Sequence, residues 1–357
     1  MHLKTINLLN FKSYEQLNLS LHPRINCFVG LNGQGKTNFL DSVFYLSMCK
    51  SNFNSIDYQN ILHGQEFFVI QGSYERLSKE ENIYCAVKKD SGKLVRRNGK
   101  EYQRLADHIG LLPIVIISPA DASLILDGSD ERRKYINSVI SQYNKSYLEN
   151  VISYNKLILS RNKLLKDKVN TSSLLDLLEV IDEQLSAIAS PIYKQRFDFV
   201  KNLTPIFQEF YQRVSGDAEN VEIHYKSDLA ENDLKFILAE NIERDRAIQY
   251  TTKGVHKDDL IFTINGYPVK KEASQGQQKT LLIALKLAQF SFISKISGIK
   301  PILLLDDIFD KLDIFRVEQF IKLIANDEFG QIFITDSNKT RLDRILESIN
   351  TDYALFN

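Results

Sequence analysis

The chain has 357 residues, of which 43% are hydrophobic and 25% are charged, a composition ordinary for a globular protein. That length is too great for one compact core and fits two domains. Basic and acidic side chains number 45 each, so the net charge of zero gives no general support to nucleic-acid binding, and any such surface must be local.

The first third of the chain has the pattern of strands. Alternating leucine and isoleucine residues predict a hairpin over residues 3–21, and the apolar run Ile25–Val29 ends at a glycine-rich turn before a helix that begins at Lys36. Between residues 59 and 117, four more strand-like segments are separated by glycine or charged turns.

One of these segments carries a local excess of positive charge. Residues 88–100 hold six lysine and arginine side chains against a single acid, Asp90. Two interpretations stay open, a solvated hairpin with Gly92 and Gly99 in its turns or part of a surface that contacts nucleic acid.

The middle of the chain has a helical pattern instead. From residue 131 to about 211 glycine is scarce and apolar residues recur at helical spacing, and between residues 174 and 192 they form a heptad-like seam. Pro191 and Pro205 are expected to kink or end helices. The pattern predicts an inserted helical domain over residues 127–214, which serves as a structural spacer or as a partner-binding surface.

After about residue 215 the mixed pattern returns. It predicts two further helices, at residues 280–296 and 313–325, and strands at residues 221–225, 260–264, 301–305 and 331–334.

A phosphate-binding loop is predicted between the third strand and the first helix. The pattern G-x-x-x-x-G-K-[ST] is satisfied by Gly30, Leu31, Asn32, Gly33, Gln34, Gly35, Lys36 and Thr37. Glycines let backbone N–H groups curl around the β- and γ-phosphates, and the helix amino terminus adds a positive dipole. Lys36 is expected to neutralise phosphate charge, and the Thr37 hydroxyl to complete the Mg²⁺ shell.

A second motif is an apolar strand that ends in two carboxylates, Asp306 and Asp307. Asp306 is expected to hold Mg²⁺ through water, as a Walker B aspartate does. Asp307 is expected to orient or deprotonate the attacking water. Two such carboxylates by themselves are equally compatible with a cap on the following turn, but together with a phosphate loop they favour catalysis.

A third motif, Ser274-Gln275-Gly276-Gln277-Gln278-Lys279, precedes a strongly apolar helix. It is similar to the signature of ABC ATPases, in which a serine hydroxyl and glycine N–H groups bind the γ-phosphate held by the other subunit. Alone, this segment favours an ordinary helix cap with Ser274 as N-cap. Its position about thirty residues before the Walker B strand favours the signature, so Ser274 and Gly276 are predicted catalytic residues.

The three motifs lie at both ends of the chain and therefore predict one discontinuous domain. The expected fold is α/β, an ABC-type P-loop ATPase domain with mixed sheets and helices, formed by residues 1–126 and 215–357. The helical domain of residues 127–214 is inserted into it.

In these motifs and several further segments the chain resembles the RecF family, small relatives of the SMC branch of ABC ATPases. The similar segments, in matching order and spacing, are residues 6–14, the phosphate loop, residues 114–121, the run GSDERRKYIN, the run GVHKDDL at residues 254–260, SQGQQK, and LLLDDIFDKLD up to Asp313. The helical insertion is the least similar part.

The resemblance implies roles for residues near the nucleotide. Lys12 stands where SMC-like ATPases have a basic residue close to the nucleotide. Residues 118–121 stand at the Q-loop, which senses the γ-phosphate; because Ala120 replaces an expected acid, Asp121 is the only carboxylate left for that task. Asp310 and Asp313 fall in the loop that crosses the dimer interface in ABC-type ATPases.

Two further positions concern histidine. His256 and Lys257 belong to the GVHKDDL segment, where a lone histidine is compatible with either a structural or a catalytic role. Thr335-Asp336 stands where many ABC proteins have Ser/Thr-His, so the switch histidine is absent and fast, histidine-assisted hydrolysis is in doubt.

The function implied by the resemblance is ATP-dependent DNA binding in recombinational repair. The cofactors are ATP and Mg²⁺, and the partners are DNA, either double-stranded or at a single/double-strand junction, and RecR-like and RecO-like proteins. Such proteins dimerise on ATP, hydrolyse it slowly and help to load recombinase at gaps and stalled replication forks. The alternatives are a transporter subunit and an ATP-gated clamp with incidental hydrolysis.

Cysteine content and hydropathy bear on the compartment. Cys27, Cys49 and Cys85 are odd in number and form no CxxC pair, which argues against a disulfide framework and a zinc site. The longest aliphatic runs, residues 114–117 and 302–305, are too short to cross a membrane, and the amino terminus lacks the features of a secretory signal. We expect a cytoplasmic protein with no membrane segment.

Overall fold

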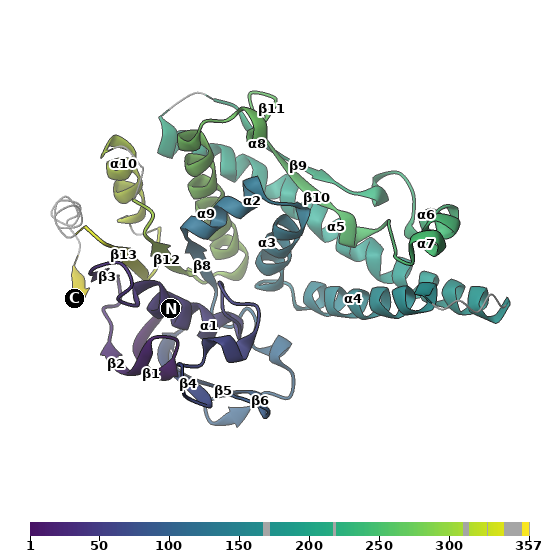
Figure 1. Cartoon of the computed structure of the whole chain (residues 1–357). Coiled ribbons are helices and arrows are strands. Elements are labelled where there is room, and N and C mark those ends of the chain that lie inside the picture. Colours follow the sequence, from purple (N-terminus) through teal and green to yellow (C-terminus); the bar gives the residue numbers. More distant parts are fainter. Residues whose placement is uncertain (167–171, 217–218, 310–313, 327, 339–351, 357) are drawn as a thin grey trace. The chain divides into compact units, whose positions relative to one another are not determined.

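The computed structural model describes all residues except 167–171, 217–218, 310–313, 327, 339–351 and 357 (Figure 1). The chain forms two compact units. Unit 1 consists of Met1–Ala122, Glu209–Ala218 and Ser274–Asn357, and unit 2 consists of Ser123–Gln208 and Glu219–Ala273.

The first sheet of unit 1 is antiparallel, with strand order β2-β1-β4-β5-β6-β7. Its strands are β1 (His2–Phe11), β2 (Tyr14–Ser20), β4 (Phe67–Arg76), β5 (Lys79–Lys88), β6 (Gly92–Arg97) and β7 (Lys100–Glu101). Burial alternates along most of β4 and β5, because one face packs on the core and the other is exposed.

The second sheet of unit 1 is parallel, with strand order β14-β3-β13-β12-β8. Its strands are β3 (Ile25–Val29), β8 (Ile114–Ile117), β12 (Ile302–Asp306), β13 (Ile332–Asp336) and β14 (Tyr353–Phe356). Every residue of β3, β8, β12 and β13 is buried, which explains why these strands have continuous apolar runs without alternation.

Unit 1 also contains the helices α1 (Lys36–Met48), α9 (Gln275–Ser297) and α10 (Ile314–Ile324). Helix α1 contacts strands of both sheets, and α9 packs on β8. Helix α9 is long and apolar enough to cross a membrane by length and composition, although the aliphatic runs at residues 114–117 and 302–305 are too short to do so. Because 72% of its most apolar 18-residue stretch is buried inside the protein, α9 is a core helix.

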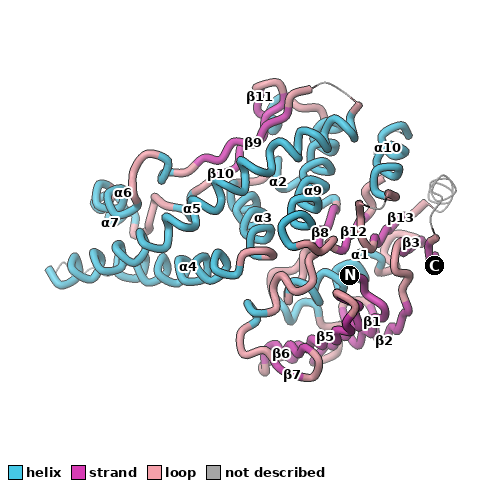
Figure 2. Tube along the Cα trace, turned by 180° about the vertical axis from the view of Figure 1, so that it is seen from behind, coloured by secondary structure: helices cyan, strands magenta, loops and turns pink. Residues whose placement is uncertain are grey.

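Unit 2 combines helices with a small antiparallel sheet of strand order β11-β10-β9. Figure 2 distinguishes its long helices from its strands. Its elements are α2 (Ser123–Leu126), α3 (Ser129–Ser141), α4 (Lys145–Lys166), α5 (Ser172–Ser215, which belongs to unit 1 from Glu209 on), β9 (Val221–Lys226), α6 (Leu234–Glu240), α7 (Ile242–Ile248), β10 (Asp259–Ile264), β11 (Tyr267–Pro268) and α8 (Val269–Glu272).

A buried arginine joins the helices of unit 2. The guanidinium of Arg161 in α4 lies 2.6 Å from Asp182 of α5 and 2.6 Å from Asp245 of α7, and it donates to the Thr251 hydroxyl. The Arg161 side chain has no exposed area, so the two carboxylates and the hydroxyl supply the partners that water would otherwise supply.

The structure bears on two expectations about the middle of the chain. Helix α5 runs through Pro191 and Pro205, so neither proline ends it; the apolar residues that α5 buries on either side offset a cost of about 3 kcal/mol per interior proline. The segment 219–273 clusters with the helices, whereas the predicted ATPase domain included it. The cause is local, because β10 pairs with β9 and packs against α3.

Candidate nucleotide-binding site

The parallel sheet of unit 1 brings the predicted motifs to one edge. In the register, Asp306 lies beside Thr335, and Asp336 lies beside Val29. The carboxyl ends of β3, β12 and β13 therefore lie at the same edge, where ligands bind in open parallel sheets. The Gly30 N–H donates to the Asp336 carbonyl at 3.4 Å and joins the start of the phosphate loop to the end of β13.

The loop between β3 and α1 has the backbone that its glycines require. Gly33 and Gly35 have φ angles of +86° and +94°, in the left-handed region that favours glycine. A Cβ atom on Gly35 would lie 2.9 Å from the Ser13 hydroxyl, so the site is closed to any side chain. The Gly35 carbonyl accepts from the Tyr14 hydroxyl at 3.1 Å, which ties the loop to β2.

Lys36 is held inside the curl of the loop. Its Nζ atom donates to the carbonyls of Gly30 at 2.7 Å and Leu31 at 3.0 Å. Because Lys36 also begins α1, its ammonium group lies at the positive end of the helix dipole. A phosphate group in the loop would meet this ammonium together with the first N–H groups of the helix.

Thr37 and Asp306 meet although they lie 269 residues apart in the sequence. The Thr37 hydroxyl is 2.9 Å and 3.0 Å from the two carboxylate oxygens of Asp306. Burial raises the pKa of Asp306, and hydrogen bonds from Thr335 and Thr37 oppose that shift. A buried carboxylate beside a hydroxyl is a ligand pair that suits Mg²⁺, so these residues fit the ion that the sequence predicts.

Asp307 follows the strand in a left-handed backbone conformation, with φ of +46°. Its N–H donates to the Thr335 hydroxyl at 3.1 Å. Asp307 is half-buried, whereas Asp306 is buried. The residue predicted to act on water thus lies next to the predicted metal ligand and is more open to solvent.

Lys12 lies in a cavity of about 480 Å³ that also contains Thr37 and Asn38. Its Nζ atom is 2.6 Å from the fully buried Asp41 of α1 and 5.3 Å from the centre of the Phe53 ring. Sequence reasoning found Lys12 and Thr37 but missed the rest of the cavity wall, which is Asn38, Phe53, Asn54, Gln59, Ile61, Leu62 and His63. No motif marks the segment of residues 53–63. Backbone hydrogen bonds from Lys12 N–H to Asn60 O and from Leu62 N–H to Asn10 O, together with a bridge between Phe11 and Ile61, bring it to the end of β1.

Asp121 is committed to partners inside the protein. Its Oδ2 accepts from the Ser118 N–H at 2.7 Å, and its Oδ1 lies 2.6 Å from the Nζ of Lys286 in α9. Both side chains of the ion pair are nearly buried, with 12% of Asp121 and 8% of Lys286 exposed. The predicted Q-loop is therefore anchored to the helix that follows the predicted signature.

Ser274 and Gly276 lie at the amino terminus of α9, outside the cluster of Lys36, Thr37 and Asp306. Ser274 is the N-cap: its hydroxyl accepts from the Gln277 N–H at 3.2 Å, and the Gln277 side chain accepts from the Ser274 N–H at 2.8 Å. Ser274 is exposed and Gly276 half-buried. This reciprocal cap lies at a helix amino terminus whose N-cap residue is exposed to solvent. Asp310 and Asp313 lie outside the described residues.

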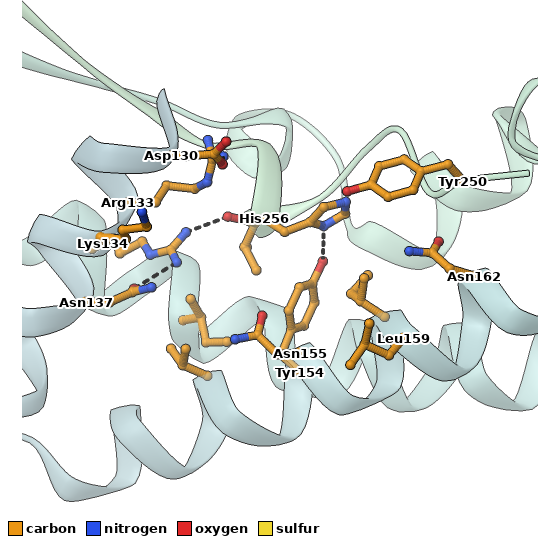
Figure 3. Close-up of a pocket in the computed structure, with 15 residues that line it drawn as sticks. Asp130, Arg133, Lys134, Asn137, Tyr154, Asn155, Leu159, Asn162, Tyr250 and His256 are labelled. Carbon is orange, nitrogen blue, oxygen red and sulfur yellow. Dashed lines mark hydrogen bonds and ion pairs between the residues drawn. The ribbon is translucent and has the colours of Figure 1, made fainter. Parts of the chain in front are cut away.

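His256 lies in unit 2, beside a cavity of about 520 Å³ (Figure 3). Its Nε2 is 3.1 Å from the Thr251 carbonyl, which can only accept, so Nε2 carries the proton and Nδ1 accepts from the Tyr154 hydroxyl at 3.0 Å. Burial lowers the pKa of His256 to about 4. Both ring nitrogens thus have hydrogen-bond partners inside the protein, and these contacts indicate a structural role for His256.

The basic hairpin of residues 88–100 uses part of its charge inside the fold. Lys93 lies 2.7 Å from Asp57, Arg97 lies 2.5 Å from Glu81, and the Arg96 guanidinium lies over the Tyr84 ring. Arg96 itself is exposed, as are the other three cations of the hairpin, Lys88, Lys89 and Lys100.

A glycine-rich loop, a Walker B strand beside it and an exposed, capped helix amino terminus after the signature-like segment define a P-loop ATPase of the ABC class. Comparison with known proteins narrows the class. The model of the RecF/RecN/SMC N-terminal domain family matches residues 2–351. The chain belongs to the RecF family of DNA replication and repair proteins.

Curated relatives match this chain from end to end. The DNA replication and repair protein RecF of Phocaeicola vulgatus is 52% identical over 100% of this chain and 96% of its own length. The RecF protein of Flavobacterium johnsoniae is 48% identical over 100% of both chains.

Solved structures agree with these relatives. The recombination mediator protein RecF bound to ATP is 30% identical, with a TM-score of 0.87 over 95% of this chain and 92% of that one. An Smc head domain from Pyrococcus furiosus, at 16% identity and a TM-score of 0.56, shares the fold.

Proposed function

We propose that this protein binds ATP with Mg²⁺ in the loop of residues 30–37 and hydrolyses it slowly to ADP and phosphate. The observation that carries the proposal is the contact of Thr37 with Asp306, because it joins the two motifs that must share one metal ion. When bound, Mg²⁺–ATP supplies the reactive γ-phosphate and the charge that these residues are built to neutralise.

Each residue of the site then has one task. Lys36 exchanges the Gly30 and Leu31 carbonyls for phosphate oxygens. Thr37 and Asp306 would hold the metal, which would neutralise phosphate charge. Asp307 orients the attacking water or accepts its proton. Lys12 borders the adjoining cavity, where the rest of the nucleotide fits.

The active site is completed by a second copy of the chain. Ser274 and Gly276 offer a hydroxyl and helix N–H groups to the γ-phosphate bound by the partner subunit. Their exposure at the amino terminus of α9 supports this arrangement. ATP therefore drives dimerisation, because each half-site lacks part of the phosphate's ligands.

The ATP-bound dimer binds DNA, either double-stranded or at a single/double-strand junction, in the cytoplasm. There it helps RecR-like and RecO-like partners to load recombinase at gaps and stalled forks. Support comes from the family and from the solved structure described as RecF–ATP in the RecFOR pathway. The exposed cations Lys88, Lys89, Arg96 and Lys100 form a local basic surface that fits phosphates in a chain of zero net charge.

A DNA-dependent ATPase assay tests the proposal. Turnover of the wild type is measured with and without double-stranded DNA, beside Lys36→Ala and the control Lys295→Ala, which removes an exposed lysine of α9. We expect DNA to raise turnover, Lys36→Ala to abolish it, and Lys295→Ala to leave it unchanged. An ATP turnover rate that does not change on adding DNA favours a transporter subunit. DNA binding without any ATP turnover favours an ATP-gated clamp.

The salt dependence of binding is a second readout. DNA affinity should require ATP and should fall with a log–log slope of roughly −0.9 for each phosphate contact. Equal binding with and without ATP would contradict the ATP-driven dimer.

A further inference from the structure

The hydroxyl of Thr335 contacts two consecutive aspartates, Asp306 at the end of β12 and Asp307 directly after it. Thr335 is fully buried in β13, and its Oγ1 atom is 2.8 Å from Asp306 Oδ1 and 3.1 Å from the Asp307 backbone N. The pairing of β12 with β13 causes this placement, because Asp306 and Thr335 are partners in the parallel register.

The direction of each hydrogen bond follows from chemistry. The Asp307 N–H can only donate, so the Thr335 oxygen accepts there. The Thr335 proton goes to Asp306 Oδ1 at 2.8 Å in preference to the Leu305 carbonyl at 3.4 Å. One buried hydroxyl therefore serves a side chain and a backbone group of consecutive residues.

The bond to Asp306 fixes a metal ligand that would otherwise lose a partner. At present Asp306 also accepts from the Thr37 hydroxyl. When Thr37 turns to a metal ion, its proton leaves Asp306, and Thr335 remains as the donor that holds the carboxylate orientation.

The bond to Asp307 supports an unfavourable backbone. A φ of +46° is uncommon for a residue with a side chain and costs roughly 1–2 kcal/mol. The hydrogen bond from the Asp307 N–H to Thr335 fixes the peptide group that precedes this turn. It thereby sets the point from which the Asp307 side chain reaches water.

We propose that Thr335 is a positioning residue for hydrolysis, which holds the metal ligand Asp306 and the water-activating Asp307 in fixed relation. This inference rests on the proposed ATPase function. Thr335 touches neither nucleotide nor water in this role; it acts through the two aspartates. Thr335 lies directly before Asp336, which stands at the position of the switch histidine. The positioning role of Thr335 needs no group that gains or loses a proton.

The test compares Thr335→Val, Thr335→Ser and Thr335→Cys with the wild type. Valine keeps the branched shape and removes both hydrogen bonds, serine keeps the hydroxyl, and cysteine offers a weaker donor and acceptor. The matched control is Thr263→Val, which makes the same change in the buried strand position of β10 in unit 2. ATP turnover, the Mg²⁺ concentration for half-maximal turnover, ATP binding and thermal midpoint are measured for each.

We expect Thr335→Val to lower kcat by about tenfold or more, since leaving a buried donor and acceptor unpaired carries a penalty of that order. The half-maximal Mg²⁺ concentration should rise several-fold, while ATP binding without hydrolysis stays within about twofold. Serine should restore both kcat and the Mg²⁺ requirement, cysteine should fall between, and Thr263→Val should match the wild type.

Three results would overturn the inference. The first is wild-type kcat and Mg²⁺ dependence in Thr335→Val. The second is a loss of turnover that follows the thermal midpoint alone and that serine does not restore, which would mark a structural role. The third applies if the Thr335→Val protein does not fold: equal turnover of Thr335→Cys and Thr335→Ser then contradicts the inference. Absence of turnover in the wild type itself would instead refute the proposed function, and the inference with it.

Discussion

The buried ion pair between Asp121 and Lys286 offers a quantitative test of the site's framework. Lys286→Met removes an ammonium 2.6 Å from the Asp121 carboxylate, where the two side chains are 12% and 8% exposed. Removing one member of a buried pair costs roughly 3–5 kcal/mol, because the other charge stays buried. The Ser118 N–H still serves Asp121, so we expect the lower end, about 3 kcal/mol.

That free energy corresponds to a fall in thermal midpoint of roughly 6–12 °C for a domain of this size. Scanning calorimetry measures it, with Lys295→Met as control because Lys295 is exposed on the same helix. The control should change stability by less than about 0.5 kcal/mol. The double variant Lys286→Met/Asp121→Leu should recover more than half of the loss, since two apolar side chains leave no unpaired charge.

Two outcomes would refute this reasoning. One is a midpoint for Lys286→Met that matches that of Lys295→Met, which would mean that the pair contributes nothing to stability. The other is a double variant no more stable than the single one, which would mean that the cost arises from lost packing of the lysine chain and not from a stranded charge.

Three further predictions concern turnover and pH. Asp307→Asn should bind Mg²⁺–ATP normally, stop turnover and trap the dimer by size-exclusion chromatography; wild-type turnover would assign the water to another residue. Ser274→Arg should leave ATP binding to the monomer intact but block dimerisation and turnover, and mixing it with Lys36→Ala should restore some turnover; dimerisation of Ser274→Arg on ATP, seen by light scattering, would refute the shared site. Burial lowers the pKa of His256 from 6.5 to about 4. The pKa of His256 is lower in the folded state than in the unfolded state. The neutral histidine's contribution to the free energy of unfolding, about 3 kcal/mol, is therefore fully present above pH 6.5 and is lost as the pH falls through 4. His256→Gln should flatten urea-unfolding free energy over that window, and an unchanged slope would contradict the assignment.

The phosphate loop and the Walker B strand were predictable because their chemistry is local. Eight consecutive residues must combine glycines, a lysine and a hydroxyl to surround a phosphate, and no other part of the chain is needed to recognise them. The buried strands of the parallel sheet were equally readable, since burial on both faces leaves a continuous apolar run. The strand bounds moved by one or two residues, so that β12 includes Asp306 and β13 includes Asp336.

The boundary between the units was less readable. Apolar spacing predicts helices over residues 131–211, and the structure has α3, α4 and most of α5 there. The same spacing does not tell which unit a following strand joins. The mixed helix and strand pattern of residues 219–273 is compatible with either unit. The pairing of β9 with β10 and the packing of α3 against β10 decide that these residues belong to unit 2.

What the sequence determined by itself is the chemistry of contiguous motifs: a loop for phosphate at residues 30–37, carboxylates at a strand end and a capped helix after Ser274. What only the tertiary structure decided is which distant groups meet. Asp121 is read from the sequence as a phosphate sensor, yet Lys286, far along the chain, takes its carboxylate. Thr335 carries no motif of its own and gains significance only because strand pairing sets it beside Asp306. The physical reason is that hydrogen bonds and ion pairs act over a few ångströms in space, whereas a sequence pattern records only neighbours along the chain.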